Sequence, residues 1–270
     1  MVQPCVMACL AHPDDELDIA TILASCAAQG AEVALVCSTN GDAGGGHAPG
    51  LSKAQLGETR ARELACSCER LGIQHLHLLP YSDSGWRTGE PAPEGSLVRA
   101  PGPEVTGHFV RLMRQYQPQV VITYGPDGEY NHRDHLAAGG WASAAYYLAG
   151  DPTAYPDSWE SRLQGWRPWR LFNIAISDTL RRLVFFPDPN IAQIGQVTHI
   201  LRLPEFAQAK LAAEACHVTQ GLYHSRMKDR LSPEQFLEEV ATERLMLAND
   251  RVPPDVDLGA FGPTMLKLLG

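Results

Sequence analysis

One histidine and three consecutive acids follow the first apolar run of the sequence, in the segment MACLAHPDDELDIA (7–20). Histidine and carboxylate side chains suit zinc or iron(II), and three protein ligands leave a coordination position for water. Pro13 favours an extended conformation at His12 and suits the first position of a helix, so the turn is stiff. Asp14 and Asp15 are adjacent and point in different directions. One can bind a metal while the other faces water, and the spacing alone does not say which.

A second polar cluster, YGPDGEYNHRDH (124–135), follows the fourth apolar run. His132 and His135 are three residues apart and share a face if a helical turn begins there. Each cluster alone is better explained structurally, because acids at a helix start satisfy free N–H groups and complement the helix dipole. Together they favour a metal site suited to hydrolysis, since bound zinc lowers the pKa of water towards ~7.

Short apolar runs alternate with helical patterns through the first half of the chain. Strands are predicted at 5–11, 32–39, 74–80 and 119–125, with helices at 16–29, 52–72, 104–116 and from about 135. This alternation predicts an α/β, Rossmann-like fold with a mostly parallel sheet and helices on both faces. In the usual strand order the first and fourth strands are neighbours, so both polar clusters would meet in one crevice at the carboxyl ends of the strands.

The pattern is looser after Asp151, where strands are predicted at 170–177 and 194–203. Helices are predicted at Pro204–His217 and Pro233–Asn249, the second with Ser232 and Gln235 as a capping box. We expect a Rossmann-like catalytic core over 1–178 and a C-terminal α/β extension over 179–270. The extension would complete the substrate cleft within one structural unit.

Composition excludes some classes of function. The net charge is −9, from 22 basic and 31 acidic residues, which argues against a nucleic-acid partner. No apolar stretch approaches ~20 residues and Met1–Pro4 carries no basic region, so we expect no membrane insertion and a cytoplasmic location. The seven cysteines are odd in number and fall mostly in apolar segments, so we expect reduced, buried thiols.

The pair AHPDDE and HRDH resembles the LmbE-like (PIG-L) metal-dependent deacetylases, which remove acetyl groups from N-acetylglucosamine conjugates. The resemblance runs from the first strand to about Gln220. YSDSGW (81–86), VVITYGPDGEYNHRDH (120–135) and KLAAEACHVTQ (210–220) are most similar to the mycothiol branch. That branch contains the deacetylase of mycothiol biosynthesis and the mycothiol S-conjugate amidase.

The resemblance implies a metal site and a set of catalytic roles. The implied metal is zinc, with iron(II) as the alternative, and its ligands are His12, Asp15 and His135. Asp14 would be the general base, and His132 would be a cation that stabilises the oxyanion. Asp134 would be an orienting partner of the histidines. Tyr130 would lie near the reacting carbonyl.

Substrate contacts are implied as well. Arg60 and Asp83 match residues that grip the sugar or its attached group. Trp86 stands where the mycothiol branch commonly has methionine, and Arg133 stands where many members have proline. These two departures concern the identity of the substrate more than the chemistry. His217, in CHVTQ, matches a histidine of the branch and is expected to contact either the substrate or the protein itself.

The expected function is metal-dependent deacetylation of a small-molecule amino-sugar conjugate, and a homo-oligomer is left open. An amidase of the mycothiol S-conjugate type is the alternative within the same chemistry. A metal-dependent sugar-binding module is the non-enzymatic alternative, although pure binding has no use for the acid Asp14 facing water. A nucleotide-binding oxidoreductase is disfavoured because no G-x-G-x-x-G follows the first strand. Inositol, malate, lipid, antibiotic and thiol conjugates are all compatible with the sequence.

Overall fold

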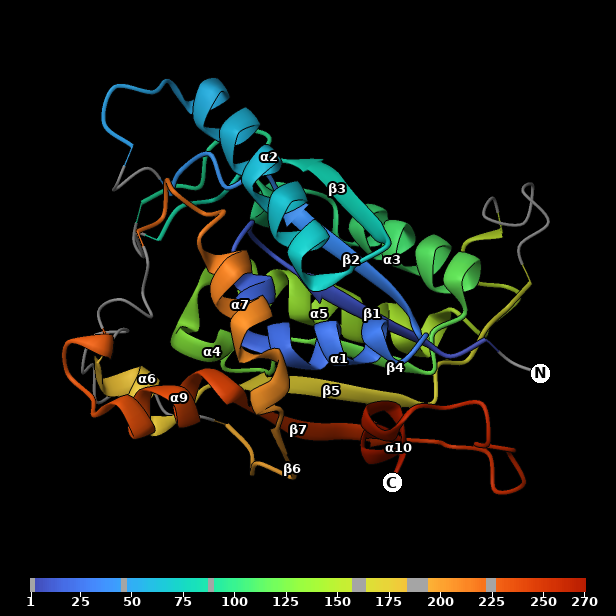
Figure 1. The fold of residues 1–270 in the computed structure, drawn as a ribbon. Helices are drawn as coiled ribbons and strands as arrows, with labels where there is room; N and C mark the ends of the chain where they lie inside the picture. The colour runs from blue at the N-terminus through green and yellow to red at the C-terminus, as the bar shows by residue number, and fades with distance from the viewer. Residues whose placement is uncertain (1–2, 45–47, 87–89, 157–163, 184–193, 222–226) are drawn as a thin grey trace.

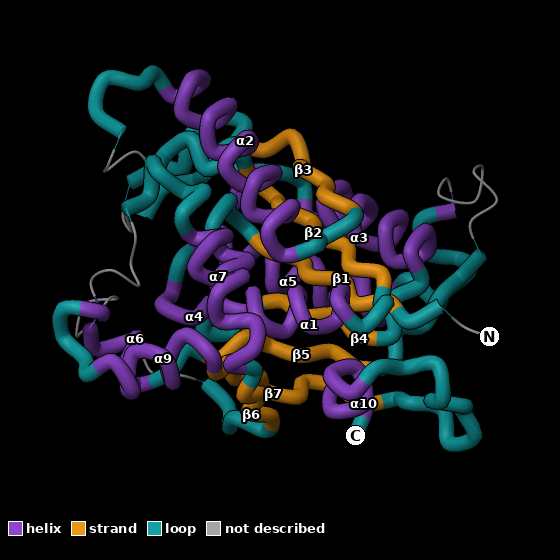
Figure 2. The backbone as a smooth tube through the Cα atoms, in the orientation of Figure 1, coloured by secondary structure: helices purple, strands orange, loops and turns teal. Residues whose placement is uncertain are grey.

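A single twisted sheet of seven strands forms the centre of the molecule, in the order β3-β2-β1-β4-β5-β7-β6 (Figures 1 and 2). The computed structural model describes residues 3–270 apart from 45–47, 87–89, 157–163, 184–193 and 222–226. The strands are β1 (Cys5–Leu10), β2 (Glu32–Thr39), β3 (His75–Tyr81), β4 (Val120–Thr123), β5 (Arg170–Ala175), β6 (His199–Arg202) and β7 (Thr242–Asp250).

Helices cover both faces of this sheet. Figure 1 shows α1 (Ala20–Ala28), α2 (Lys53–Leu71) and α7 (Ala207–Glu214) on one face, with α3 (Gly102–Tyr116) and α5 (Arg133–Leu148) on the other. The shorter elements are η1 (Asp15–Ile19), η2 (Leu97–Arg99), α4 (Gly128–Asn131), α6 (Asp178–Leu183), η4 (Pro204–Phe206), α9 (Pro233–Ala241) and α10 (Pro263–Leu269). No helix in the described ranges is both long enough and apolar enough to cross a membrane.

The mostly parallel sheet predicted from the sequence is confirmed. Strands β1 to β5 pair in parallel, and β1 lies directly between β2 and β4. Every residue of β1 is buried, as expected for a strand whose two faces are both covered by helices. The expected adjacency of the first and fourth strands therefore holds, and their carboxyl ends lie side by side.

The termini of α2 show why this helix begins and ends where the sequence predicts. The Ser52 hydroxyl accepts a hydrogen bond from the backbone N–H of Gln55, and the Gln55 side chain accepts one from the N–H of Ser52. Gly72 ends the helix in the left-handed conformation, with φ of 72°. The helix is thereby fixed over Lys53–Leu71, and it carries Arg60 towards the carboxyl end of β1.

The helix predicted over Pro233–Asn249 is wrong in its second half. It begins at the Ser232–Gln235 capping box as predicted, but α9 ends at Ala241 and residues 242–250 form β7. Strand β7 runs antiparallel between β5 and β6 and buries Leu245 and Met246. Pairing on both sides outweighs the helical propensity of this leucine-rich segment.

The expectation that all cysteines are reduced is also wrong, for one pair. Cys66 of α2 and Cys216, just after α7, form a disulfide with their Cα atoms 5.8 Å apart. The two residues are 150 positions apart in sequence, so their proximity is a property of the fold rather than of any local spacing. The other five cysteines are free and buried, in agreement with the prediction.

Candidate active site

The two polar clusters meet at the carboxyl ends of β1 and β4. His12 and Asp15 follow β1, and His132 and His135 lie at the start of α5. His12 Nδ1 lies 3.3 Å from Asp15 Oδ2 and 3.2 Å from His135 Nε2, and Asp15 Oδ1 lies 3.4 Å from the same nitrogen. Ligand atoms about 2.1 Å from a tetrahedral metal lie roughly 3.3 Å from one another. This buried trio therefore fits a divalent cation.

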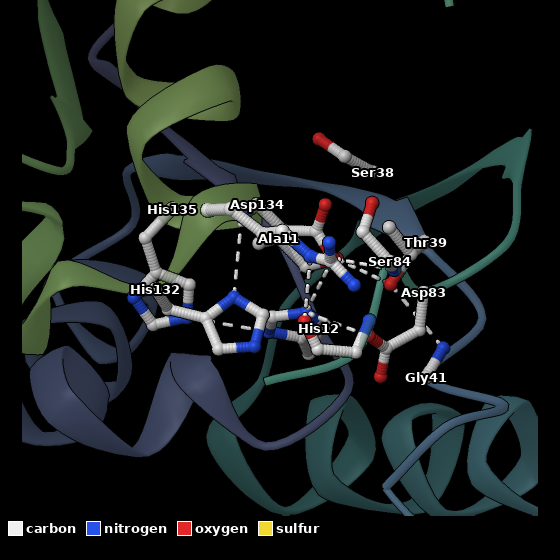
Figure 3. Close-up of polar contacts among 12 residues, drawn as sticks. Ala11, His12, Ser38, Thr39, Gly41, Asp83, Ser84, His132, Asp134 and His135 are labelled. Carbon is white, nitrogen blue, oxygen red and sulfur yellow. Dashed lines mark hydrogen bonds and ion pairs between the residues drawn. The ribbon is translucent and has the colours of Figure 1, made fainter. Parts of the chain in front are cut away.

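The same histidine contributes to two other donor sets, and the first joins it to His132 and His135. Single donor atoms of His12, Asp83, His132 and Asp134 all lie within 4.8 Å of one another, and all four residues are buried. Figure 3 shows His12 between the pair His132–His135 and Asp83. A buried histidine and carboxylate group that could hold a metal is thus present at this crevice.

Asp14 is held in an unusual backbone conformation beside these donors. Its φ is 113°, and its backbone N–H donates to Glu16 Oε2 over 3.0 Å. Its carboxylate accepts a hydrogen bond of 3.0 Å from Arg60 Nη2. Burial raises the pKa of Asp14 to about 6, although the Arg60 guanidinium opposes the shift. A carboxylate with a pKa near neutrality suits general base catalysis.

Arg60 is expected to grip the sugar, and it does line the cavity, but its guanidinium is engaged mainly by the protein. Besides Asp14, it donates to the carbonyl oxygens of Gly41 and Pro13. Gly41 has a φ of 66°, and a side chain there would collide with the guanidinium. Gly41 begins the glycine-rich loop GDAGGGHAPG (41–50), so the start of this loop makes room for Arg60. His47, further along that loop, lies outside the described residues.

Asp134 contacts His12 rather than lying between the two histidines that flank it in sequence. Its Oδ2 lies 3.2 Å from His12 Nε2 and accepts a hydrogen bond of 2.8 Å from the N–H of Ser84. A carboxylate on the outer nitrogen of a histidine orients the ring and leaves the other nitrogen free to bind a metal. Here the free nitrogen is the Nδ1 that faces Asp15.

His132 is expected to be a cation, and its surroundings disfavour that charge. Burial and the neighbouring His12 and His135 lower the pKa of His132 to about 2. The backbone N–H of Asp134 donates to His132 Nδ1 over 3.2 Å. The ring is therefore neutral with its proton on Nε2, and it can donate a hydrogen bond through that atom.

Aromatic rings form one side of the cavity. Trp86 is 52% exposed and stacks on Tyr130, with the ring centroids 5.0 Å apart. The Tyr130 hydroxyl lies 3.3 Å from His135 Nε2, one of the atoms that could bind a metal. An exposed aromatic stack beside a polar crevice presents a flat apolar surface to a ligand.

The open cavity has a volume of about 220 Å³. The expected site residues all line it except Asp134 and His135, which are fully buried. Sequence reasoning missed Ala43, Gly44, Gly85 and Gln220, which also line it. Gln220 ends the CHVTQ segment and donates to the carbonyl oxygen of Gly44 over 2.9 Å.

Two further buried residues contact Asp15 and His135 on the side away from the cavity. Tyr124 donates a hydrogen bond to Asp15 Oδ2, and its ring stacks on His135 at a centroid distance of 4.0 Å. Glu129 Oε2 lies 3.1 Å from His135 Nδ1. From the sequence, Glu129 is expected either to support the site or to be solvated in its turn, and the structure places it against His135.

His217 has a structural contact rather than a place in the cavity. Its Nε2 lies 2.6 Å from Glu16 Oε1, and the same oxygen accepts a hydrogen bond from the Ser67 hydroxyl. The other oxygen of Glu16 accepts from the N–H of Asp14. His217 thus supports Asp14 through Glu16.

Comparison with known proteins points in one direction. Residues 7–146 match the family model described as GlcNAc-PI de-N-acetylase (PIG-L). A 1D-myo-inositol 2-acetamido-2-deoxy-alpha-D-glucopyranoside deacetylase of Streptomyces avermitilis is 34% identical, covering 78% of this chain and 80% of its own. A protein of the same name from Thermobispora bispora is 32% identical, covering 95% of this chain and 94% of its own.

Solved structures share the fold at lower identity. The N,N'-diacetylchitobiose deacetylase of Pyrococcus horikoshii superimposes with a TM-score of 0.69 at 20% identity, covering 94% of this chain and 88% of its own. The teicoplanin deacetylase Orf2 gives a TM-score of 0.57 at 17% identity, covering 91% and 99% of the two chains.

Proposed function

The chain belongs to the GlcNAc-PI de-N-acetylase (PIG-L) family, and from this premise we propose that it is a metal-dependent hydrolase that removes the acetyl group of an N-acetylglucosamine conjugate. One observation carries the proposal. Buried donor atoms of His12, Asp15 and His135 lie 3.2 to 3.4 Å from one another beside the cavity that Asp14 lines, and the pKa of the Asp14 carboxylate is raised to about 6.

We assign the metal to His12 Nδ1, the Asp15 carboxylate and His135 Nε2, in preference to the two sets that contain His132. The near-equal separations of 3.2 to 3.4 Å support this choice. Zinc is the cation that this ligand set suits best, with iron(II) as the alternative. Such a cation would polarise the acetyl carbonyl and lower the pKa of the attacking water.

The protein's own groups then move the protons. Asp14 takes a proton from the attacking water and returns it to the nitrogen of the leaving amine, so that the amide and water become acetic acid and a free amine. His132, neutral and protonated on Nε2, donates a hydrogen bond to the carbonyl oxygen as its negative charge develops. The Tyr130 hydroxyl faces the same region. Asp134 orients His12 through its carboxylate and His132 through its N–H.

The substrate is proposed to be a small glucosamine conjugate of the kind named for the Streptomyces and Thermobispora relatives, with inositol as the first aglycone to test. Asp83 and Arg60 are both buried and both line the cavity, in positions to fix the sugar hydroxyls. The stack of Trp86 on Tyr130 offers an apolar surface to one face of the sugar or to its aglycone.

The test compares acetate release from N-acetylglucosaminyl conjugates that carry different aglycones, using zinc-loaded wild-type protein and Asp14→Asn. Loss of a general base typically costs 10²–10⁴-fold in rate. We expect Asp14→Asn to bind one equivalent of zinc, as the wild type does, and to lose activity by that factor. An Asp14→Asn protein of normal rate would remove the base assignment. A zinc-loaded wild type that releases no acetate from any conjugate would instead favour sugar binding without catalysis.

A further inference from the structure

Glu129 is a buried carboxylate that faces one partner. Its side chain is fully buried, and its Oε2 lies 3.1 Å from His135 Nδ1. Within the described residues, neither oxygen of Glu129 has a hydrogen-bond partner of good geometry, and no lysine or arginine forms an ion pair with it. Burying a carboxylate without a cation or several hydrogen bonds is costly, so this placement asks for an explanation.

The backbone that presents Glu129 is itself strained. Glu129 has φ of 63° and ψ of −58°, and Gly128 and Asn131 also have positive φ. Asp127 fixes the turn, since its side chain accepts from the N–H of Glu129 over 3.2 Å and its carbonyl accepts from the N–H of Asn131 over 2.9 Å. Such strain persists only where the surrounding structure demands it, and it is concentrated at functional sites.

The ring of His135 lies between Glu129 and the proposed metal. Tyr124 stacks on it with an interplanar angle of 16°, which fixes the plane of the ring. A carboxylate oxygen 3.1 Å from Nδ1 favours the tautomer with its proton on Nδ1 and leaves Nε2 free. Nε2 is the atom that lies 3.2 Å from His12 Nδ1 and 3.4 Å from Asp15.

We propose that Glu129 is a positioning residue for the metal, which fixes the tautomer of His135 and strengthens it as a ligand. The inference rests on the metal site of the proposed function. Because a bound dication makes the outer N–H of an imidazole more acidic, the contact between Glu129 and His135 strengthens when the metal binds. Glu129 thus does for His135 what Asp134 does for His12, so each histidine ligand has its own buried carboxylate.

Metal affinity tests this role directly. Full-length wild type, Glu129→Gln and Glu129→Gly are stripped of metal and titrated with Zn²⁺ against a chromophoric chelator. Loss of such an outer carboxylate typically weakens metal affinity 10–100-fold. We expect the Zn²⁺ dissociation constant of Glu129→Gly to rise by that factor and that of Glu129→Gln to rise less, since an amide oxygen still accepts a hydrogen bond. The visible absorption of Co²⁺-loaded protein should change in the same order.

Two control variants separate this role from strain and from burial. Asn131→Gly relieves a positive φ in the same turn at an exposed residue. Glu63→Gln alters a buried carboxylate whose partner is Thr219, not a histidine. Both should bind Zn²⁺ as the wild type does. A purely structural Glu129 would instead lower the thermal midpoints of the metal-free and Zn²⁺-loaded proteins together and leave the dissociation constant unchanged.

The outcomes distinguish this inference from the proposed function. If Glu129→Gly does not fold, the nearly isosteric Glu129→Gln decides. Wild-type affinity for Zn²⁺ in the folded Glu129 variants would overturn the role of Glu129 alone. A wild-type protein that binds neither Zn²⁺ nor Co²⁺ would remove the metal site and, with it, the proposed function.

Discussion

Asp14 combines three features that a catalytic base in a buried crevice needs. The left-handed backbone at φ of 113° turns its carboxylate away from Asp15, so adjacent acids face different groups. Burial raises its pKa, and the Arg60 guanidinium, 3.0 Å away, keeps the rise moderate. The resulting pKa of about 6 leaves the carboxylate ionised at neutral pH while it remains basic enough to accept a proton.

This balance predicts a pH dependence. A base must be deprotonated, so kcat/KM of the wild type should rise with pH through a value near 6 and then level off. Arg60→Met removes the charge that lowers the pKa of Asp14, so its rising limb should move to higher pH. The profile is measured from acetate release on the zinc-loaded proteins.

Arg133→Met is the matched control for that measurement. Arg133 also lies beside the cavity, but it donates to the carbonyl oxygens of Gly85 and Glu90 and does not contact Asp14. The rising limb of the kcat/KM profile of Arg133→Met should coincide with that of the wild type. An Arg60→Met profile that superimposes on the wild-type profile would show that another group controls the acidic limb.

Individual residues of the site could be predicted where they belong to a sequence motif. They could not be predicted where only the fold brings them to the site. The two polar segments are recognisable because they follow apolar runs that end at the same edge of a sheet. The choice of His12, Asp15 and His135 as metal ligands is implied only by the resemblance to the family. The charge of His132 was not predictable, since its low pKa arises from burial beside two other histidines. For Glu129 the sequence leaves two alternatives, a supporting contact or solvation, because its turn gives no sign that its side chain points inwards.

At the scale of elements, one ion pair joins Glu16 of η1, next to the proposed ligand Asp15, to His217 in the turn after α7. Burial opposes ionisation of Glu16 and His217, yet the pairing lowers the pKa of Glu16 and raises that of His217. The stability due to Glu16 is present above its unfolded pKa of ~4.3, and that due to His217 below its unfolded pKa of ~6.5. The pair therefore stabilises the fold most between these values.

Glu16→Gln should lower the free energy of unfolding by about 3–5 kcal/mol near pH 5.5, the cost of breaking a buried ion pair. The difference from wild type should shrink as pH rises through the folded pKa of His217, because the neutral histidine gains little from the charge of Glu16. Denaturant unfolding at a series of pH values measures both effects.

An exposed ion pair provides the comparison. The side chains of Arg202 and Glu238 are 69% and 45% exposed, so Glu238→Gln should cost less than about 1 kcal/mol. Its effect should not vary between pH 6 and 9. A Glu16→Gln deficit that is equally independent of pH would mean that Glu16 stabilises the protein through Ser67 and the backbone rather than through His217.

The same scale shows where secondary structure could be predicted from the sequence. Helix α2 has a capping box at its start and a glycine at its end, so residues next to each end determine where the helix begins and stops. Strand β7 has no such signal, because the segment after Ala241 continues with residues that favour helices. Only its position between β5 and β6 makes it a strand, and that position depends on residues more than 60 positions away in β5.

At the scale of the whole molecule, the C-terminal part of the chain is built into the core rather than appended to it. Strands β6 and β7 extend the sheet, α10 packs on α1, and α7 lies against α1 and α2. The turn after α7 supplies His217 to Glu16 and Gln220 to the cavity. The site is therefore complete only when this part of the chain has docked on the first half.

The disulfide between Cys66 and Cys216 covalently links the C-terminal part of the chain to α2 in the first half. It joins α2, which carries Arg60, to the turn that carries His217, and both of these residues support Asp14. A cross-link over so long a loop restricts the unfolded chain and typically stabilises a protein by about 2–4 kcal/mol. The double variant Cys66→Ser/Cys216→Ser should lose stability in that range, and so should reduced wild type.

Denaturant unfolding of wild type and the double variant, each with and without a phosphine reductant, checks this. Reductant should lower the stability of the wild type to that of the double variant and leave the double variant unchanged, which excludes effects on the five buried thiols. Because the packing of α7 on α1 and α2 does not depend on the bond, both reduced forms should still fold and bind Zn²⁺. A wild type whose unfolding is indifferent to reductant would mean that the docking of α7 is fixed by packing and by the Glu16–His217 pair alone.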